Sequence, residues 1–346
     1  MDTNSTSTYF PASELSSAYV CVGLTAIVSN LFTFAILFSD TKLLRQFALV
    51  AGFTFSHFML ALYVSSSGIE RLASSDVANQ MVSAWGCIRL IYPIIYPVAF
   101  QSSALLLCVV GVERLTAVSA PYWYRKWMTE KNMWCLMLVV FTSVIPSVVI
   151  GISVASYLPP TTRVCSQPTV FGSPYVAYVR VSSAAGGTVA VAMTISALAI
   201  GTRRIRKLPL LSGEAGKIKR QLQLTKAMLS VAFLDFCLVV IPNTISFAAT
   251  IYEMAIPAYV SQVSNLAYCI NASADIFCYL VFNSQFRAAA AKLFRIGHHS
   301  TQHIRPISAM DNANVGNGAA APSRLTRKNK VDFQQDRVDA WAATDM

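Results

Sequence analysis

The chain has 346 residues, of which 55% are hydrophobic and 12% are charged, whereas about a quarter of the residues in a soluble domain are charged. The apolar residues lie in long runs, so the composition indicates a helical integral membrane protein and excludes both a soluble globular fold and an alternating β-barrel. The formal net charge of +11 belongs mostly to segments between these runs, which predicts contact with lipid headgroups and cytosolic partners and no binding of nucleic acid.

Residues 1–16 form a polar segment ahead of the first apolar run. They lack the basic start of a cleavable signal peptide, so we expect the first helix to remain as an uncleaved anchor. Asn4-Ser5-Thr6 is a glycosylation acceptor sequence, which favours an extracellular position for this segment.

Seven apolar runs reach the roughly 20 residues that a helix needs to cross about 30 Å of hydrocarbon. They lie near 17–38, 47–67, 86–112, 132–156, 175–201, 225–250 and 260–282. We therefore predict an all-α membrane protein, with a seven-transmembrane helix bundle over residues 17–283.

Lysine and arginine gather in the segments that follow the first, third, fifth and seventh helices. They are Lys42, Arg45, Arg125, Lys126, Lys131, Arg203, Arg204, Arg206, Lys207, Lys217, Lys219, Arg220, Arg287, Lys292 and Arg295. The opposite segments carry little beyond Arg71, Arg89 and Arg163. Because basic residues concentrate in cytoplasmic loops, we expect the N-terminus outside, the C-terminus in the cytoplasm, and the chain in the plasma membrane.

The predicted topology separates the eight cysteines. Six fall inside apolar helices, where a cysteine usually acts as a small hydrophobic residue. Only Cys87, at the outer start of the third helix, and Cys165, between the fourth and fifth helices, face the oxidising side. We therefore expect one disulfide, which ties the Cys165 loop down over the bundle.

Glu113-Arg114-Leu115 lies at the cytoplasmic edge of the third helix and is followed by Pro121 and Tyr124. An arginine beside a glutamate at the edge of a membrane is costly to leave unpaired and usually has a functional partner. Pro121 should stop the helix. An ordinary juxtamembrane charge pair is the alternative interpretation of the triplet.

Residues 284–296 predict a short amphipathic helix after the seventh span. Phe286, Leu293 and Phe294 would face lipid, and Arg287, Lys292 and Arg295 would face headgroups. Residues 297–346 are polar and lack an apolar period, so we expect a disordered cytoplasmic tail.

These motifs together resemble the rhodopsin-like (class A) G-protein-coupled receptor family, from the first helix to the short eighth helix. Glu113-Arg114-Leu115, Pro121 and Tyr124 are similar to its Asp/Glu-Arg-Tyr signature and second intracellular loop, and Asp275 to Tyr279 resembles its seventh-helix Asn/Asp-Pro-x-x-Tyr motif. The resemblance implies that Glu113, Arg114, Leu115, Pro121, Tyr124 and Tyr279 take part in coupling to a heterotrimeric G protein. It also implies the Cys87–Cys165 disulfide and a sixth-helix kink at Pro242.

Several positions depart from the family pattern. Leu115 replaces the usual Tyr of the third-helix motif, Val240 the sixth-helix Trp and Ile276 the seventh-helix Pro. Such losses are similar to those in divergent invertebrate receptors, the nematode serpentine chemoreceptor groups among them. They leave open whether coupling is retained.

Asn30, His57 and Asp275 occupy polar positions of the first, second and seventh helices, and the family's sodium-binding Asp aligns with His57. Because a carboxylate inside a bundle needs a partner or a proton, we expect these three residues to form an interhelical network. It would hold either an ion pair or a neutral His hydrogen-bonded in the core. No metal or cofactor site is predicted.

The outer ends of the helices offer Tyr92, Tyr96, Gln101 and Arg180 as a ligand pocket. Arg180 would meet an acidic group of a ligand, or its side chain would extend to lipid headgroups. No Lys lies between Lys226 and Lys292, so the seventh helix cannot form a retinal Schiff base. Tyr96 stands where amine receptors of the family carry an Asp, which disfavours a monoamine ligand.

The sequence therefore predicts a receptor that transmits an extracellular signal, from a peptide or a small chemosensory molecule, to a G protein. The alternative is a seven-helix transporter or ligand-gated channel, in which His57, Asp235 and Asp275 would line a path. An enzyme is not expected, because no nucleophile–base arrangement and no HExxH-type metal motif occurs in the sequence.

Overall fold

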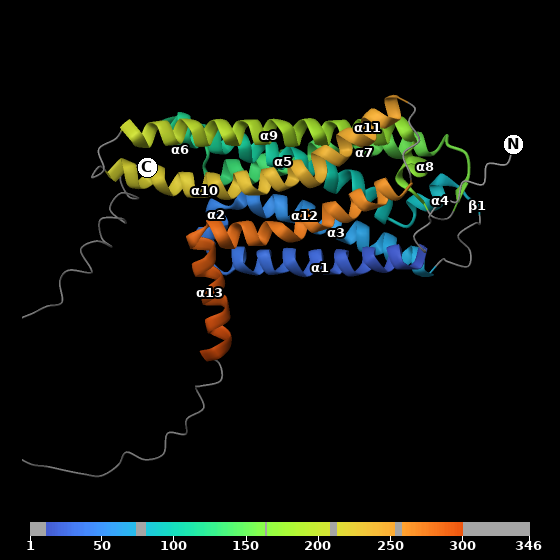
Figure 1. The fold of residues 1–346 in the computed structure, drawn as a ribbon, viewed down its shortest axis with the longest axis horizontal. Helices are drawn as coiled ribbons and strands as arrows, with labels where there is room; N and C mark the ends of the chain where they lie inside the picture. The colour runs from blue at the N-terminus through green and yellow to red at the C-terminus, as the bar shows by residue number, and fades with distance from the viewer. Residues whose placement is uncertain (1–11, 74–80, 163–164, 208–212, 253–257, 300–346) are drawn as a thin grey trace, which may run out of the picture. The chain divides into compact units, whose positions relative to one another are not determined.

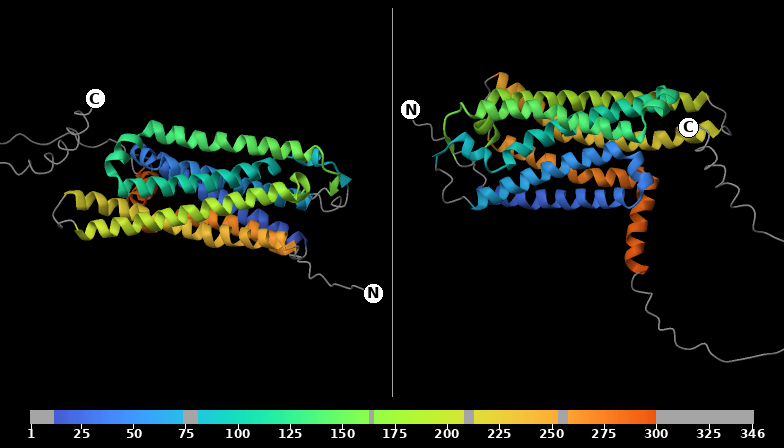
Figure 2. Two further views of the ribbon diagram at one scale, coloured as in Figure 1. Left: turned by 90° about the horizontal axis from the view of Figure 1, so that it is seen from above. Right: turned by 180° about the vertical axis from the view of Figure 1, so that it is seen from behind.

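The structure, a computed structural model, describes residues 12–73, 81–162, 165–207, 213–252 and 258–299. Among these residues it contains seven helices that are long and apolar enough to cross a membrane. They run alongside one another in one bundle (Figures 1 and 2). The predicted seven-helix membrane fold is confirmed.

The bounds of the elements follow the chain in order. The spans are α1 (Ala12–Phe38), α3 (Ala48–Ala73), α5 (Tyr92–Ser119), α7 (Glu130–Ala155), α9 (Ser173–Lys207), the continuous run of α10 (Gly213–Asp235), η2 (Phe236–Val240) and α11 (Ile241–Ile251), and α12 (Ala258–Phe282). The shorter helices are α2 (Thr41–Gln46), α4 (Ala84–Ile88), α6 (Pro121–Trp127), α8 (Gln167–Phe171) and α13 (Ser284–His299). Two short strands, β1 (Met81–Val82) and β2 (Thr161–Thr162), pair antiparallel.

Helices α3 and α5 lie mostly inside the bundle, whereas α7 is largely exposed. The outward apolar side chains of α7, such as Leu138 and Ile150, are exposed, as expected where lipid replaces water around a span. Close packing of α5 on α9 depends on small residues. A Cβ added to Gly111 would lie 3.2 Å from the Ala190 carbonyl oxygen, and one added to Gly186 would lie 3.2 Å from the Ala104 carbonyl oxygen.

The third span does not begin where the sequence predicts. A single helix was expected from residue 86 onward, with Cys87 at its start, but the chain forms α4, turns at residues 89–91 and then starts α5 at Tyr92. Pro93 lies at the first turn of α5, where its missing N–H has no helical partner to lose. Ile91 takes a positive φ of 64° in the turn.

The sixth span was expected to kink at Pro242. It is irregular there, but the irregularity is a π-helical segment, η2. η2 ends two residues before Pro242, which lies in the first turn of α11. Because proline has no backbone N–H, the carbonyl group one turn earlier loses its α-helical partner. The wider π-helical turn lets that carbonyl group accept a hydrogen bond from another N–H group. The span also begins earlier than expected, so residues from Gly213 onward, predicted as loop, are helical.

Helix α13 leaves the end of α12 crosswise to the bundle (Figure 1). Phe286 was expected to face lipid, and this expectation is wrong. Its side chain is fully buried and its ring lies 5.6 Å from that of Tyr279. Phe294 is exposed, and its ring lies 5.5 Å from that of Phe32. The first turn of α13 therefore packs into the bundle.

Candidate functional site

Glu113 and Arg114 are buried together near the end of α5, with exposed fractions of 2% and 3%. Arg114 donates from Nε to Glu113 Oε2 at 2.7 Å and from Nη2 to Glu113 Oε1. The Tyr124 hydroxyl of α6 donates to the same Oε1 atom at 2.7 Å. A buried charge is tolerated only when it is paired and hydrogen-bonded, and these three side chains meet that condition.

Tyr124 lies outside the spans and is half-buried. Burial of its phenol and the neighbouring charge of Glu113 raise the pKa of Tyr124 above its ordinary value. Its ordinary pKa is already about 10, so the phenol keeps its proton at physiological pH. Tyr124 is therefore a permanent donor to Glu113.

Arg114 also reaches a second span. Its Nη1 donates to Gln221 Oε1 of α10 at 3.2 Å, so the Glu113–Arg114 pair joins the third span to the sixth. Arg204 of α9 donates from Nη1 to the Val118 carbonyl oxygen at 2.6 Å, near the end of α5. A cation suits this position because the last carbonyl groups of a helix lack backbone partners. Three spans therefore meet at this end.

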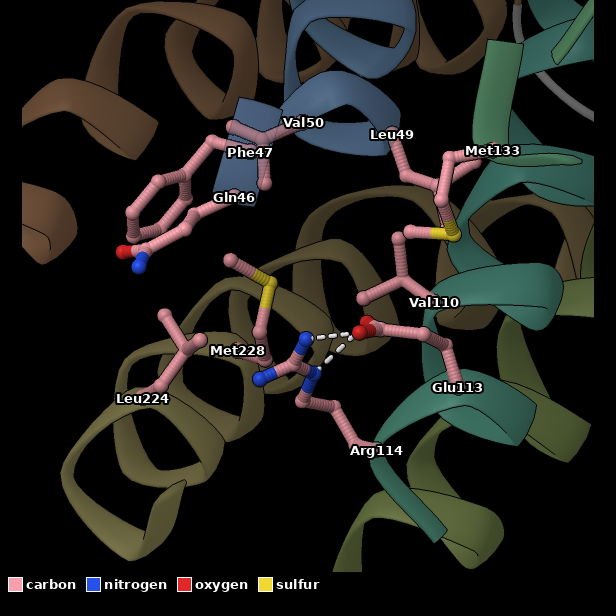
Figure 3. Close-up of a pocket in the computed structure, with 10 residues that line it drawn as sticks. All are labelled: Gln46, Phe47, Leu49, Val50, Val110, Glu113, Arg114, Met133, Leu224 and Met228. Carbon is pink, nitrogen blue, oxygen red and sulfur yellow. Dashed lines mark hydrogen bonds and ion pairs between the residues drawn. The ribbon is translucent and has the colours of Figure 1, made fainter. Parts of the chain in front are cut away.

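A small hollow that opens to the surface lies beside this cluster (Figure 3). Its walls come from α2, α3, α5, α7 and α10 and are mostly apolar apart from the charged pair. The lining residues are Gln46, Phe47, Leu49, Val50, Val110, Glu113, Arg114, Met133, Leu224 and Met228. Flexible apolar side chains such as Met suit a surface that adapts to a partner.

The other predicted residues of this end lie in different surroundings. Leu115 is half-buried and Pro121 is the exposed first residue of α6. Tyr279 is buried, does not line the hollow, and its hydroxyl has no hydrogen-bond partner among the described residues. The structure thus gathers Glu113, Arg114 and Tyr124, and leaves Tyr279 apart from them.

His57 of α3 faces Asp275 of α12 inside the bundle. Nδ1 of His57 and Oδ2 of Asp275 lie 2.7 Å apart, and both side chains are buried. The Nδ1 atom nevertheless makes no well-directed hydrogen bond, so the two side chains are close but the contact lies off the N–H direction. Asn30 does not bond to either side chain. Its Nδ2 donates to the Ala272 carbonyl oxygen at 3.3 Å, which joins α1 to the backbone of α12.

A second buried carboxylate, Asp235, belongs to the same region. Its Oδ1 accepts a hydrogen bond of 3.2 Å from Asn271 Nδ2, one helical turn before Asp275. Spacing in the sequence shows that Asn271 and Asp275 share one helix face, but it does not show that Asp235 meets that face.

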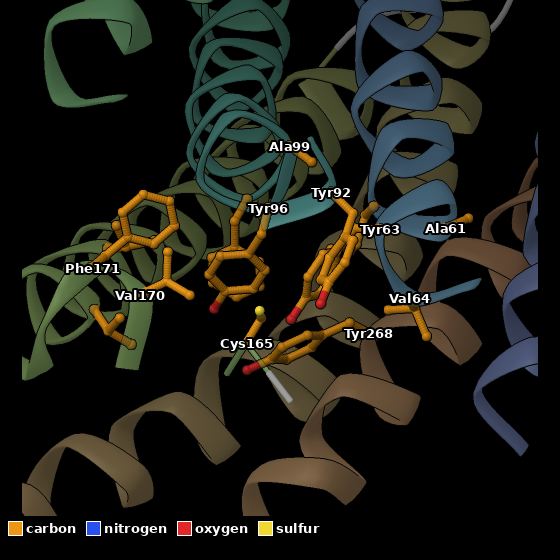
Figure 4. Packing of buried hydrophobic residues seen from close by; sticks show 14 of the residues in the cluster. Ala61, Tyr63, Val64, Tyr92, Tyr96, Ala99, Cys165, Val170, Phe171 and Tyr268 are labelled. Carbon is orange, nitrogen blue, oxygen red and sulfur yellow. The ribbon is translucent and has the colours of Figure 1, made fainter. Parts of the chain in front are cut away.

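At the opposite end of the bundle, Cys87 and Cys165 are joined by a disulfide. The disulfide brings α8 close to α4, and Val170 and Phe171 of α8 are buried in the core there. An aromatic cluster lies beside it, formed by Tyr63, Tyr92, Tyr96, Phe100 and Tyr268, with neighbouring ring centroids 4.9 to 6.2 Å apart (Figure 4). The cluster joins α3, α5 and α12.

The predicted ligand residues divide into two groups. Tyr92 and Tyr96 belong to the aromatic cluster, whereas Arg180 of α9 is half-buried and is not a member of it. Gln101 points elsewhere, because its Nε2 donates to Ser147 Oγ of α7 at 2.8 Å. Tyr63 and Tyr268 were missed. Their neighbour Phe100 could have been found, since Tyr92, Tyr96 and Phe100 repeat at four-residue intervals.

Two predictions fall outside the described residues. They are the glycosylation acceptor Asn4 and the tail, of which residues 300–346 are not described. Among the residues that are described, no group of three or more His, Cys, Asp or Glu side chains could hold a metal ion.

Comparison with known proteins identifies a family. The sequence profile described as "Serpentine type 7TM GPCR chemoreceptor Srsx" matches residues 20–294. Comparison with curated proteins gives no match. The matched region contains all seven spans apart from the first residues of α1, and it extends into α13. The predicted resemblance to nematode serpentine chemoreceptors is confirmed, and the chain belongs to the Srsx family of serpentine seven-transmembrane chemoreceptors.

Proposed function

We propose that this multi-pass membrane receptor binds an extracellular chemosensory molecule at its disulfide end and activates a heterotrimeric G protein at its Glu113 end. In this orientation the N-terminus is outside and α13 lies at the cytoplasmic side. The proposal rests chiefly on one observation, the Glu113–Arg114 pair beside an open hollow with a hydrogen bond to Gln221 of the sixth span.

Coupling would work by release of this pair. While Arg114 is held by Glu113 and Gln221, α5 and α10 remain joined across the hollow. Separation of α10 from α5 would break the bond to Gln221, widen the hollow and expose Arg114 to a partner. The apolar walls around Leu224 and Met228 would then contact the G protein, with Leu115, Pro121 and Tyr279 nearby as secondary elements.

Ligand recognition would involve the aromatic cluster. Tyr92 and Tyr96 would contact the ligand and Arg180 would bind an acceptor or acidic group, while Gln101 would support the site from its bond to Ser147. A small molecule fits this proposal better than a peptide, because Tyr92 and Tyr96 are buried in the core cluster that also contains Val170 and Phe171 of α8, and β1 and β2 pair the adjacent loops. A transporter or channel is disfavoured by membership in a receptor family.

The test is basal nucleotide exchange on purified G proteins, with the receptor reconstituted in nanodiscs. Glu113→Gln should raise basal exchange, because it removes the charge partner that holds Arg114. Arg114→Ala should abolish exchange. Glu130→Gln is the matched control, since Glu130 pairs with Arg45 at the same end but is exposed. Normal exchange by Arg114→Ala, at equal amounts of folded receptor, would contradict the coupling role.

A further inference from the structure

Helix α6 connects two membrane spans and presents an unusual surface. Its sequence is PYWYRKW. The aromatic side chains Tyr122, Trp123 and Trp127 are 79%, 62% and 51% exposed, and Arg125 and Lys126 are exposed as well. Single exposed apolar residues are common on protein surfaces, but three exposed aromatic side chains within seven residues form a patch, and a patch indicates a binding surface.

Four of these side chains share one face of the helix. Lys126 follows Tyr122 by four residues and Trp127 follows Trp123 by four, and residues four apart are neighbours on a helix surface. The Trp123 and Trp127 rings stack with centroids 5.6 Å apart and planes at 27°. Lys126 therefore stands among aromatic rings, and Arg125 lies on the adjoining flank. We call Tyr122, Trp123, Arg125, Lys126 and Trp127 the α6 patch.

The α6 patch is held facing outward by the opposite side of the helix. Tyr124 is half-buried, whereas the other six residues of α6 are exposed, and its hydroxyl donates to Glu113 at 2.7 Å. This bond fixes the rotation of the helix about its axis. The charges of the patch have no acidic neighbour to satisfy them, since among the described residues neither Arg125 nor Lys126 forms an ion pair, Glu113 is paired with Arg114 and Glu130 with Arg45.

The position of α6 limits what can cover the patch. The span α5 ends at Ser119 and the span α7 begins at Glu130, so both ends of α6 are attached to helices that cross the membrane. Tyrosine and tryptophan are enriched at the level of the lipid headgroups, where their rings are apolar and their polar atoms reach water. Basic side chains at the same level attract anionic lipids.

We propose that the α6 patch is a binding site for the headgroup of an anionic phospholipid, held by Lys126 and Arg125 and flanked by the rings of Tyr122, Trp123 and Trp127. Its occupancy would hold Tyr124 on Glu113, so that the lipid stabilises the closed Glu113–Arg114–Gln221 arrangement. The lipid site does not depend on the proposed function. The effect of the lipid on the Glu113–Arg114–Gln221 arrangement rests on the proposed coupling to a G protein. A G protein is the other partner that could cover the patch.

The experiment measures quenching of tryptophan fluorescence by brominated lipids in nanodiscs. The full-length receptor is placed in phosphatidylcholine that contains equal mole fractions of either brominated phosphatidylserine or brominated phosphatidylcholine. The contribution of Trp123 and Trp127 is obtained by difference from the Trp123→Phe/Trp127→Phe variant. Brominated phosphatidylserine should quench these two residues more strongly, which reports its enrichment at the patch.

Charge removal separates a site from general attraction. Arg125→Gln/Lys126→Gln should reduce the enrichment roughly fivefold for each cation removed, the usual size of a single cation's effect at a membrane surface. Arg203→Gln/Arg206→Gln removes the same charge from exposed residues of α9 and should leave the enrichment unchanged. An equal loss in the two double variants, or equal quenching by both lipids in the original receptor, overturns the proposal.

Two further measurements test whether a G protein covers the α6 patch instead of lipid, and whether lipid binding affects Glu113. If neither brominated lipid quenches Trp123 and Trp127, but an added G protein blocks aqueous quenching of them by iodide, the patch is a protein contact and the lipid proposal is wrong. If the lipid selectivity is present while basal nucleotide exchange is the same in both membranes, the lipid site stands and its link to Glu113 fails. The two failures are therefore distinguishable.

Discussion

Arg114 is held by three groups that come from different places in the sequence. Glu113 is its neighbour on α5, Gln221 belongs to α10, and Tyr124 acts through Glu113 from α6. Glu113 supplies the charge and the other two fix the geometry. Because the pKa of Tyr124 is raised, the folded-state contribution of this phenol is fully present below its unfolded pKa of about 10 and is lost only at higher pH.

The contact of His57 with Asp275 is the residue-scale feature most open to a direct test. His57→Ala and Asp275→Ala should each lower the midpoint of thermal unfolding, because each leaves a buried polar partner unsatisfied. The double variant should lose less than the sum of the two, with a coupling of about 0.5–3 kcal/mol. Unfolding is followed on purified receptor in one detergent.

A remote pair serves as the control for this cycle. His57→Ala combined with Glu130→Ala should be additive, since Glu130 is exposed and pairs with Arg45. Additivity in the His57/Asp275 cycle as well would show that the 2.7 Å contact contributes nothing to folding.

The sequence singled out residues that the structure brings together, but it did not predict all of their partners. Arg114, Glu113, Cys87 and Cys165 stood out because charge at a membrane edge and thiols outside the bilayer are unusual locally. Gln221 lies 107 positions from Arg114 and carries no local signal. Gln101 and Arg180 both appeared to belong to one pocket, and only packing shows that the Gln101 amide bonds to α7.

At the scale of the helices, the π-helical segment η2 depends on a small residue opposite it. A Cβ added to Gly187 of α9 would lie 2.5 Å from Val240 Cγ2 and 3.0 Å from Asp235 Oδ2. Gly187→Ala should therefore force η2 away from α9 and destabilise the receptor by about 1–3 kcal/mol, as overpacking generally does. The measurement is thermal unfolding, with ligand-independent nucleotide exchange as a second readout.

The rescue variant identifies the cause. Val240→Ala removes the methyl group that Gly187→Ala would meet, so Gly187→Ala/Val240→Ala should be more stable than Gly187→Ala alone. If Val240→Ala worsens the defect instead, the loss comes from some other effect of Gly187→Ala than contact with η2.

Helix boundaries were the least predictable part of the fold. Hydropathy ended the second helix at residue 67, but α3 continues to Ala73 through Glu70 and Arg71. Backbone hydrogen bonding carries a helix beyond the hydrocarbon, whereas hydropathy records only the apolar part. The break between α4 and α5 was missed because proline is tolerated inside a membrane span, as Pro97 is in α5, as well as at a helix start, so Pro93 did not mark a boundary.

The Cys87–Cys165 disulfide should stabilise the packing of α8 near α4. Cys165→Ala should free α8 from α4 and lower stability by roughly 2–5 kcal/mol, by analogy with small secreted domains. Cys87→Ala/Cys165→Ala should be no less stable than Cys165→Ala, because the single change already removes the bond. Cys21→Ala is the control, as Cys21 is exposed and unpaired. Equal unfolding midpoints for Cys165→Ala and the control would mean that the disulfide adds no stability.

Across the whole bundle, interhelical polar contacts follow one another from end to end. Tyr268 donates to Asn243 at 2.6 Å near the aromatic cluster, Asn271 to Asp235 lies further along α12, and Asp275 meets His57 one turn later. Arg114 and Gln221 complete the series at the hollow. α12, α11, α10, α3 and α5 all take part, so movement of the sixth span would disturb several of these contacts together.

The proposed direction of signalling requires one orientation of the bundle in the membrane, with the disulfide end outside the cell. Tyr157 lies at the disulfide end and is 89% exposed, and Ser284 is exposed at the start of α13. In a receptor with the exposed Cys21 and Cys135 changed to Ser, Tyr157→Cys should react with a membrane-impermeant maleimide in intact cells. Ser284→Cys should react only after permeabilisation, since the proposed orientation, which rests on the distribution of basic residues, puts that end in the cytoplasm. The reverse result would place the Glu113 hollow outside the cell, where no G protein could reach it.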